Sequence, residues 1–447
     1  MATVVAVLAM AAGTAQAATP VQLPGTAGCV ALKGEGGCAA GRAIAEPQGP
    51  LVISPDGRSA YLVAHSNPEA ISADALDVFD RDPTTGALTQ KPGAAGCLAA
   101  SGRDGCARDA VLFGAKEAIV SPDGRNVYVT TRAGVAAFAR DATTGALTPL
   151  GGSAQCLGAP AVGTTPCQVG VGLERPDALA ASPDGGEIYV TNDHRPTIAI
   201  LRRDPLTGKL SQPAGAAGCV VADRRGGTCR GLGRRGGAIT AIVATPDGSG
   251  VYVIAVAEGV TSVGIFSRQA NGSLRRVGGR TGCLHKTGPG GCRAGHGLRL
   301  IEGIALSPDG HSLYVTSTYS SYAGAISTFT RGAGAALSQA PGAAGCLSVN
   351  GGECAVDKAL ADVEAVAVSP DGTGVYVTGL YGLAVLDRGE SGALTVPAGK
   401  AACISDFKKL CTAAHGLEAT TAVTVSPDSK NVYVTSLEPG GVAVFSR

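Results

Sequence analysis

The chain of 447 residues contains no tryptophan, and Phe, Trp and Tyr together make up only 4% of it. Sugar-binding proteins rely on aromatic rings that stack on the sugar, so this scarcity argues against a lectin. Neither sign of charge is in excess, because 36 Lys and Arg residues face 35 Asp and Glu residues. Nucleic-acid-binding proteins usually show a basic excess, so we expect no nucleic acid partner. No apolar run reaches the roughly 18 residues that a membrane span requires.

Several catalytic motifs are missing as well. The sequence has no Gly-x-Ser-x-Gly elbow, no His-Glu-x-x-His helix and no phosphate-binding P-loop. Residues 231–236 match the dinucleotide-binding fingerprint in their letters, but no parallel βαβ pattern surrounds them. We therefore expect no bound cofactor and no dedicated metal site.

What the chain does contain is a repeated hairpin. Residues 119–130 read IVSPDGRNVYVT: an apolar strand end, a Ser-Pro-Asp-Gly turn and a β-branched returning strand. Copies recur about sixty residues apart along the whole chain, and such a period is typical of repeat architectures. The seven turns begin at Ser54, Ser121, Ser182, Thr245, Ser307, Ser369 and Ser426.

Each repeat also carries a second turn of the Thr-Thr-Gly type and a cysteine-containing loop. This order predicts four short antiparallel strands per repeat and an all-β, seven-bladed β-propeller over residues 18–447 as a single domain. The last repeat lacks its fourth strand, and residues 19–25 resemble that strand, so we expect the N-terminus to complete the last blade. A β-sandwich is the alternative fold, but it would not repeat at a constant period.

Strand order assigns two faces to the ring. The Ser-Pro-Asp-Gly and Thr-Thr-Gly turns lie on one side, which we name the turn face. The longer loops after the second and fourth strands lie on the other side, which we name the loop face. Because function concentrates on variable loops held by a rigid scaffold, we expect the functional site on the loop face.

The fourteen cysteines form close pairs, one in each repeat and always at the same place. Their spacing is too wide for the pairs that bind zinc, and it predicts seven local disulfides in an oxidising compartment. The expected pairs are Cys29 with Cys38, Cys97 with Cys106, Cys156 with Cys167, Cys219 with Cys229, Cys283 with Cys292, Cys346 with Cys354, and Cys403 with Cys411.

Residues 1–17 resemble a signal peptide, with a short apolar core and the small residues Ala15 and Ala17 before the expected cleavage point. The chain is therefore expected to be secreted. No Lys or Arg precedes the apolar core, so we expect the natural start to lie upstream. The alternative is that these residues form an apolar N-terminal strand.

The repeat motifs carry a resemblance to a known family. Residues 189–192 read Tyr-Val-Thr-Asn, and the segment after the hairpin at residues 81–88 reads Arg-Asp-Pro-Thr-Thr-Gly-Ala-Leu. With the Ser-Pro-Asp-Gly turn before them, these segments resemble the YVTN-type repeat of the seven-bladed lactonase family. The resemblance implies a propeller along essentially all of residues 18–447. It also implies a metal-free lactonase site of His, Arg and Glu in the central funnel, although no local motif transfers those residues to this chain.

Counting back five residues from each turn gives the points where the inner strands leave the loop face. These residues should ring the mouth of the central channel. Two of them, Glu302 and Glu364, lie on neighbouring blades, where one carboxyl group is suited to act as a general base or both are suited to hold calcium. A solvated channel rim is the alternative. The full set is Gly49, Lys116, Asp177, Thr240, Glu302, Glu364 and Thr421.

Three further residues are candidates for the channel site. His194 lies in a loop-face connection and suits acid–base chemistry, whereas Arg175 and Arg299 lie close in sequence to the ring and suit an anionic substrate. An exposed or packed histidine is the alternative for His194. His296 and His415 each begin a His-Gly-Leu run, so we expect a shared structural role for them.

The fourth cysteine loop is rich in arginine. We expect Lys116 and Asp177 to contribute to ligand binding at the channel mouth, and this basic loop to receive a phosphate, a sulfate or an acidic polymer. A solvated basic loop is the alternative. The arginines are Arg224, Arg225, Arg230, Arg234 and Arg235.

Two functions are consistent with these features. The first is a monomeric extracellular scaffold that binds a small molecule, a protein or an acidic polymer on its braced loop face. The second is a metal-free lactone hydrolase, with Glu302, Glu364 or His194 as the base and Arg175 or Arg299 holding an anionic substrate. The first predicts a flat loop face and a channel plugged by side chains. The second predicts a deep pocket where His, Glu and Arg converge.

Overall fold

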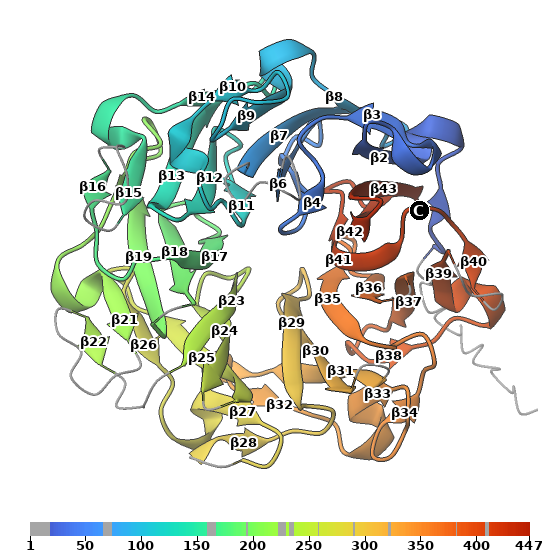
Figure 1. The fold of residues 1–447 in the computed structure, drawn as a ribbon. Coiled ribbons are helices and arrows are strands. Elements are labelled where there is room, and N and C mark those ends of the chain that lie inside the picture. The colour runs from blue at the N-terminus through green and yellow to red at the C-terminus, as the bar shows by residue number, and fades with distance from the viewer. Residues whose placement is uncertain are drawn as a thin grey trace, which may run out of the picture.

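The computed structural model describes residues 18–65, 74–158, 167–193, 195–221, 229–231, 237–257, 259–288, 291–320, 323–380, 382–406 and 411–447. Apart from short 3-10 turns, the regular elements in these residues are β-strands. The strands form seven separate sheets, and the inner strand of each faces an open centre (Figure 1). The architecture is an all-β propeller. The expected signal peptide, residues 1–17, lies outside the described residues.

We number the sheets in chain order. Sheet 1 contains β4 (Glu46–Pro47), β5 (Val52–Ile53), β6 (Ser59–His65), β7 (Asp74–Arg81), β8 (Leu88–Gln90), β9 (Cys97–Ala99) and β10 (Ala107–Arg108). Sheet 2 contains β11 (Ala118–Val120), β12 (Asn126–Thr131), β13 (Gly134–Arg140), β14 (Leu147–Pro149), β15 (Cys156–Gly158) and β16 (Gln168–Val169). Sheet 3 contains β17 (Pro176–Ala181), β18 (Glu187–Asn192), β19 (Thr197–Arg203), β20 (Leu210–Ser211), β21 (Cys219–Val221) and β22 (Arg230–Gly231).

The next two sheets carry the longest strands. Sheet 4 contains β23 (Ala238–Ala244), β24 (Gly250–Ala257), β25 (Val260–Arg268), β26 (Leu274–Arg276), β27 (Cys283–His285) and β28 (Arg293–Ala294). Sheet 5 contains β29 (Leu300–Leu306), β30 (Ser312–Ser320), β31 (Ala323–Arg331), β32 (Leu337–Ser338), β33 (Cys346–Ser348) and β34 (Ala355–Val356).

Sheet 6 follows the same order, and the seventh combines the two ends of the chain. Sheet 6 contains β35 (Val363–Val368), β36 (Gly374–Gly379), β37 (Gly382–Arg388), β38 (Leu394–Thr395), β39 (Cys403–Ser405) and β40 (Thr412–Ala413). Sheet 7 contains β41 (Glu418–Val425), β42 (Asn431–Glu438), β43 (Gly441–Ser446), β1 (Val21–Gln22), β2 (Cys29–Leu32) and β3 (Ala39–Gly41).

The 3-10 turns mark the approach to the cysteines and a few loops. They are η1 (Gly25–Gly28), η2 (Glu35–Gly37), η3 (Gly93–Gly96), η4 (Ala110–Leu112), η5 (Gly152–Ala154), η6 (Gly215–Ala217), η7 (Gly279–Gly282), η9 (Ala333–Ala335), η10 (Gly342–Gly345) and η11 (Gly399–Ala402). No helix in this part of the chain is long and apolar enough to cross a membrane.

The prediction of four antiparallel strands per blade is wrong. Six sheets contain six strands each, and sheet 1 contains seven because its inner strand is split into β4 and β5. In sheet 2, both β14 and β15 pair antiparallel with β13, and β16 then pairs parallel with β15. The parallel strand exists because a disulfide joins the start of β15 to the residue just before β16, which holds the two segments side by side. The cysteine loop is thus part of the sheet.

The N-terminal strands complete sheet 7. β1 pairs antiparallel with β43, with Val21 opposite Ser446, and β2 pairs with β43, with Cys29 opposite Ala443. In Figure 1 the blue β2 and β3 accordingly lie beside the red β43. The pairing joins the two ends of the chain in one sheet, and it covers the free edge that β43 would otherwise expose.

The seven predicted disulfides are all present, and each closes the cysteine loop of one sheet. Their Cα–Cα distances lie between 4.7 and 4.8 Å, which is within the usual range for this bond. The second cysteine of each pair stands at or just before the short parallel strand at the outer edge of its sheet. The bonds join Cys29 to Cys38, Cys97 to Cys106, Cys156 to Cys167, Cys219 to Cys229, Cys283 to Cys292, Cys346 to Cys354, and Cys403 to Cys411.

The apolar core lies between neighbouring sheets. For example, Tyr61 and Val63 of sheet 1 pack with Val127 and Phe138 of sheet 2. Burial of such β-branched and aromatic side chains is the main favourable term that holds adjacent sheets together.

A polar contact on the turn face also joins each sheet to the next, and we name it the arginine latch. At the junction of sheets 1 and 2, Nη2 of Arg140 lies 2.8 Å from Oδ2 of Asp56, and Nε of Arg140 donates to the hydroxyl of Tyr61. The Arg140 side chain is only 1% exposed. Ion pairs of the same kind occur at all seven junctions: Arg81–Asp428, Arg140–Asp56, Arg203–Asp123, Arg268–Asp184, Arg331–Asp247, Arg388–Asp309 and Arg447–Asp371.

Candidate functional site

The central channel is a cavity of about 560 Å³. It is not plugged by side chains, contrary to what the binding hypothesis predicts. Six of the seven residues counted back from the turns line it: Gly49, Lys116, Asp177, Thr240, Glu302 and Thr421. The regular hairpin geometry explains this result, because each of these residues lies five positions before the turn that ends its inner strand.

Lys116 is held by two carboxylates within the protein. Its Nζ lies 2.8 Å from Oδ1 of Asp177 and 2.7 Å from Oδ2 of Asp193. Arg175 lies 3.6 Å from the same oxygen of Asp193 and is itself largely exposed. Burial alone would lower the pKa of Lys116, but the hydrogen bonds to Asp177 and Asp193 outweigh it and raise that pKa. The cation at the channel mouth is therefore already neutralised.

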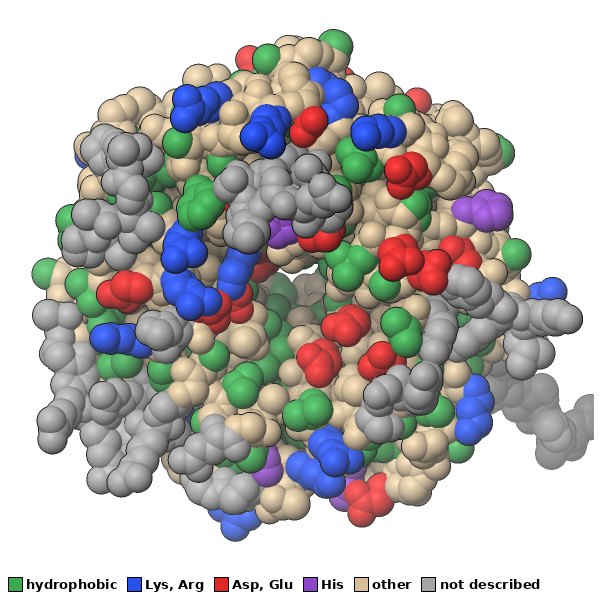
Figure 2. Space-filling model, viewed as in Figure 1, with side chains coloured by type: hydrophobic (Ala, Val, Ile, Leu, Met, Phe, Trp, Pro, Cys, Tyr) green, Lys and Arg blue, Asp and Glu red, His purple; other side chains and the backbone are tan. Residues whose placement is uncertain are grey.

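Carboxyl groups on the opposite side of the mouth, Glu302 and Glu364, form no ion pair with any described residue. Burial, and then the charges of Glu302 and Asp362, raise the pKa of Glu364 to about 7. Burial and the charge of Asp362 also raise the pKa of Glu302. Figure 2 shows this asymmetry, with Lys and Arg side chains gathered on one side of the channel mouth and Asp and Glu on the other. Among the described residues, no group of three or more His, Cys, Asp or Glu is arranged to hold a metal ion.

Glu117, next to Lys116, also lines the channel. Burial and the charge of Asp177 raise the pKa of Glu117 to about 8. The sequence pattern did not single it out, because the spacing from the turn selects Lys116 instead.

The structure does not describe five of the other predicted site residues. His194 and four of the five loop arginines, Arg224, Arg225, Arg234 and Arg235, lie outside the described residues. Arg230 belongs to the short β22 and is exposed. Within the described part of the chain, no histidine lines the channel. The predicted convergence of His, Glu and Arg in the funnel is therefore not seen there.

A second cavity, of about 640 Å³, opens on the loop face between sheets 4 and 5. We name it the interblade pocket. One side comes from the cysteine loop of sheet 4 and the segment that leads to β29; the other comes from β30, β31 and the cysteine loop of sheet 5. Its charged and aromatic lining consists of Lys286, His296, Arg299, Tyr319 and Glu353.

The backbone at His296 is fixed by sheet 5. Gln339 accepts a hydrogen bond from the backbone N–H of His296 and donates one to its carbonyl oxygen. Gln22 makes the same pair of bonds to the backbone of His415. The two His-Gly-Leu runs thus have the expected structural role, which their backbone N–H and C=O groups perform. The ring of His296 takes no part in these bonds and lines the pocket.

Gly297 allows the sharp turn at this point. Its φ is +73°, and a Cβ there would lie 2.3 Å from Oγ of Ser327. That hydroxyl donates to the carbonyl oxygen of His296 at 2.8 Å. Only glycine lets the chain approach β31 this closely, and this approach positions His296 and Arg299 at the pocket.

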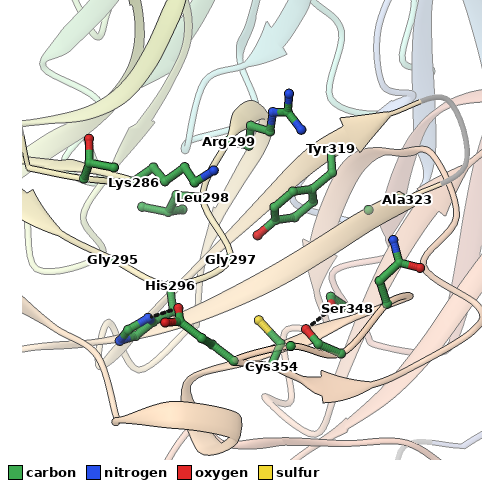
Figure 3. A pocket seen from close by; sticks show the side chains of 16 residues that line it. Lys286, Gly295, His296, Gly297, Leu298, Arg299, Tyr319, Ala323, Ser348 and Cys354 are labelled. Carbon is green, nitrogen blue, oxygen red and sulfur yellow. Dashed lines mark hydrogen bonds and ion pairs between the residues drawn. The ribbon is translucent and has the colours of Figure 1, made fainter.

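The groups in the pocket carry both signs of charge. Nδ1 of His296 lies 2.5 Å from Oε2 of Glu353. Figure 3 shows Lys286 and Arg299 on one side, His296 on the other and the hydroxyl of Tyr319 between them. Burial and the charge of Glu353 raise the pKa of Tyr319, whereas Arg299 acts in the opposite direction. Neither Lys286 nor Arg299 forms an ion pair with any described residue.

Of these residues, sequence reasoning selected only Arg299 for a functional role, and it assigned Arg299 to the channel. Lys286 and Glu353 lie inside the cysteine loops of two consecutive repeats. Because the two loops occupy the same place in their repeats, the sequence could have indicated that they lie next to each other on the loop face. Tyr319 has no such signal, because it lies near the end of the long strand β30, outside both cysteine loops.

Comparison with known proteins bears on the fold. No protein-family model matches this chain, and no curated protein matches it either. A structure of Kuenenia stuttgartiensis hydrazine synthase is 16% identical, with 92% of this chain and 98% of that chain covered and a TM-score of 0.52. The β-propeller domain of Myceliophteria thermophila Cps50 (Swd1) is 13% identical, with 90% and 97% covered and a TM-score of 0.50.

Lactonase-like propellers also appear among the similar structures. The Pseudomonas aeruginosa periplasmic gluconolactonase is 18% identical, with 78% of this chain and 83% of that chain covered and a TM-score of 0.48. The similarity to the two structures with TM-scores of 0.50 and 0.52 bears on the propeller fold, and identities this low show nothing about activity.

Proposed function

We propose that this chain is a small-molecule-binding propeller whose ligand site is the interblade pocket of the loop face. The observation that carries the proposal is the pair of cations there, Lys286 and Arg299, which line a cavity of ligand size without an ion-pair partner among the described residues. Pockets of roughly 300–1,000 Å³ with a few convergent polar groups are typical ligand sites.

The channel offers a weaker site for an anionic ligand. Its cation Lys116 is held by Asp177 and Asp193, so a ligand anion would have to displace carboxylates that are already in place. Because a cation that two carboxylates already hold gains little from a further anion, Lys116 supports the channel rim rather than a ligand.

The disulfides support a preformed pocket. Cys283–Cys292 and Cys346–Cys354 close the two cysteine loops that carry Lys286 and Glu353. A site that is already ordered loses less conformational entropy on binding, so bracing of both loops favours affinity.

The seven disulfides also indicate that the protein functions in an oxidising compartment, which is consistent with an extracellular protein. Secretion as a monomer stays a prediction, as does a role for the arginine-rich loop.

A ligand screen by thermal shift on the fully oxidised protein tests the proposal. Ligands at about 100 times their Kd stabilise a protein by about 2.7 kcal/mol, which raises the melting temperature by a few degrees. Hits should shift the parent protein and lose most of their effect in Lys286→Ala and Arg299→Ala. The matched control is Arg280→Ala, an exposed arginine of η7 outside the pocket. Hits that shift all four proteins equally would contradict the proposal.

A lactone hydrolase is the second candidate, and the contact between His296 and Glu353 favours it. In such a reaction Nε2 of His296 takes a proton from water as the water oxygen attacks the lactone carbonyl carbon. Arg299 or Tyr319 donates to the carbonyl oxygen as negative charge develops on it. The ring C–O bond then breaks, and the proton passes from His296 to the leaving oxygen.

A lactone-hydrolysis assay separates the two candidates. The hydrolase requires turnover that falls by about 10² or more in His296→Ala and clearly in Glu353→Gln. The channel variants Glu302→Gln and Glu364→Gln serve as controls, since a loss of turnover in them would place the reaction in the funnel instead. No turnover on sugar or aliphatic lactones leaves the binding function.

A further inference from the structure

We propose that the interblade pocket binds a short peptide with free termini, its carboxylate against Lys286 and Arg299 and its ammonium group against Glu353. This inference rests on the proposed function and names the class of ligand. The pocket carries charges of opposite sign on opposite sides, and a peptide of two or three residues carries them at its two ends.

The positive side has the groups that recognise a carboxylate. Lys286 and Arg299 are both exposed to the pocket and have no carboxylate partner among the described residues. An arginine side chain presents a planar fork of N–H donors that fits a carboxylate in a bidentate manner. The Tyr319 hydroxyl lies between the two sides of the pocket and supplies a further donor (Figure 3).

The negative side has an acceptor for an ammonium group. Glu353 uses Oε2 for its contact with His296, and its other oxygen makes no hydrogen bond to the described residues. The Glu353 side chain is 73% exposed, so a ligand reaches it without rearrangement of the loop. The His296 contact fixes the direction of the carboxylate, because the His296 backbone is itself held by Gln339.

The wall between these charges suits a peptide backbone. Gly351 and Gly352 line the pocket with φ values of +70° and +75°, and nothing lies within 4 Å of the place where a Cβ of Gly352 would be. Glycines without side chains let another backbone approach and reach the N–H and C=O groups.

Neither a simple anion nor a simple cation uses the whole pocket. A small anion pairs with Lys286 and Arg299 but makes no use of the exposed Glu353 carboxylate, and a cation does the reverse. A zwitterion pairs both sides at once, so removal of either terminal charge should weaken binding. This dependence on both ends distinguishes a zwitterionic ligand such as a peptide from a simple anion or cation.

Isothermal titration calorimetry on the oxidised full chain tests the inference with trialanine, N-acetyl-trialanine and trialanine amide. Trialanine should bind, and each blocked form should bind at least tenfold more weakly, since loss of a charge-assisted hydrogen bond costs about that factor. Arg299→Ala and Lys286→Ala should weaken binding of trialanine but add little to the weak binding of the amide. Glu353→Gln should weaken binding of trialanine but leave that of N-acetyl-trialanine unchanged.

Arg280→Ala is the control and should bind all three peptides like the parent protein. Melting temperatures of the variants exclude unfolding as a cause. Equal affinity for free and blocked peptides, or no binding of trialanine, overturns the peptide assignment. If a hit of the thermal-shift screen depends on Arg299 while trialanine does not bind, the proposed function stands and only the peptide assignment fails. If no ligand depends on Arg299, both fail.

Discussion

The turn face and the loop face of this propeller are built from the same repeat but use charge in opposite ways. On the turn face every latch arginine is paired with an aspartate of the neighbouring sheet, and hydrogen bonds lower the pKa values of those aspartates. On the loop face Lys286 and Arg299 lack ion-pair partners among the described residues, and the carboxyl groups of Glu302 and Glu364 have raised pKa values. Paired charges stabilise the ring, and unpaired charges are available to a ligand.

The largest effect is expected from acid, because it acts on all seven latches at once. Burial alone would raise the pKa of Asp309, but hydrogen bonds from Ser307, the His311 backbone and Arg388 lower it to about 2. The pKa of Asp371 is likewise lowered to about 2. A carboxyl group whose pKa is lower in the folded state stabilises the fold above its unfolded pKa of about 3.9, and this contribution is lost as pH falls toward 2.

Denaturation midpoints measured between pH 6 and pH 2 check this prediction. Stability should be nearly constant above about pH 5 and should fall steeply between about pH 4 and 2. A flat profile over that range would show that the latches add little to the fold.

Removal of a single latch should have the next largest effect. Arg140→Ala deletes a buried guanidinium and leaves Tyr61, Asp56 and the carbonyl of Gly124 without their donor. Asp56 is 34% exposed and keeps its bonds from Ser54 and the Arg58 backbone, so the cost comes mainly from the two other partners, at about 1–3 kcal/mol for each buried polar group left without its donor. Chemical denaturation measures the loss, with Arg58→Ala as the control, because Arg58 is an exposed arginine of the same turn face and should cost under about 0.5 kcal/mol. Equal effects of the two variants would refute the role of the latch.

Disulfides should matter to a similar or smaller extent, but only some of them should affect the ligand. Replacing Cys346 and Cys354 by serine, or Cys97 and Cys106, opens loops of similar size and should cost about 2–3 kcal/mol in either case. Of these two variants, only the one that lacks the Cys346–Cys354 bond should weaken binding in the interblade pocket, because that bond holds the loop with Glu353. Calorimetric unfolding measures the loss of stability, and ligand titration measures the loss of affinity. If both variants lost affinity equally, the cause would be reduced overall stability and not the loop that carries Glu353.

The smallest effect concerns the channel mouth. Glu364 has a pKa raised to about 7, so the folded state holds its proton more tightly than the unfolded chain. Stability should therefore decline slightly as pH rises from about 4.3 toward 7, and Glu364→Gln should reduce this decline. Melting temperatures of both proteins at pH 5 and pH 8 test it. A steeper decline in the variant would show that the carboxylate form is the one favoured by folding.

The features that repeat along the chain were predictable from sequence. A strand pair flanks each of the seven turns, for example β11 and β12 around Ser121, and the cysteines of each repeat are joined. The same period placed Lys116 and Asp177 on the channel wall. The latch arginines carried a weaker signal, since only Arg81, Arg140 and Arg203 precede an aspartate, and an arginine before a turn shows no partner in the sequence.

The features that depend on how two sheets meet were not predictable. Residues 286, 319 and 353 come together only because two cysteine loops and one extended strand lie at the same junction. Asp193 lies outside the counted ring, so its contact with Lys116 was not expected. The short parallel strands were not predicted either, because a two-residue strand such as Gln168–Val169 is too short to show the alternation of apolar and polar residues that marks a strand.

The central claim is that ligand binding belongs to the interblade pocket and not to the channel. The most direct test is ligand-induced stabilisation of Arg299→Ala beside Arg175→Ala, an exposed arginine at the channel mouth. The account predicts that Arg299→Ala abolishes the shift in melting temperature while Arg175→Ala keeps it. Loss of the shift in Arg175→Ala with the full shift in Arg299→Ala would contradict the account and move the site to the channel.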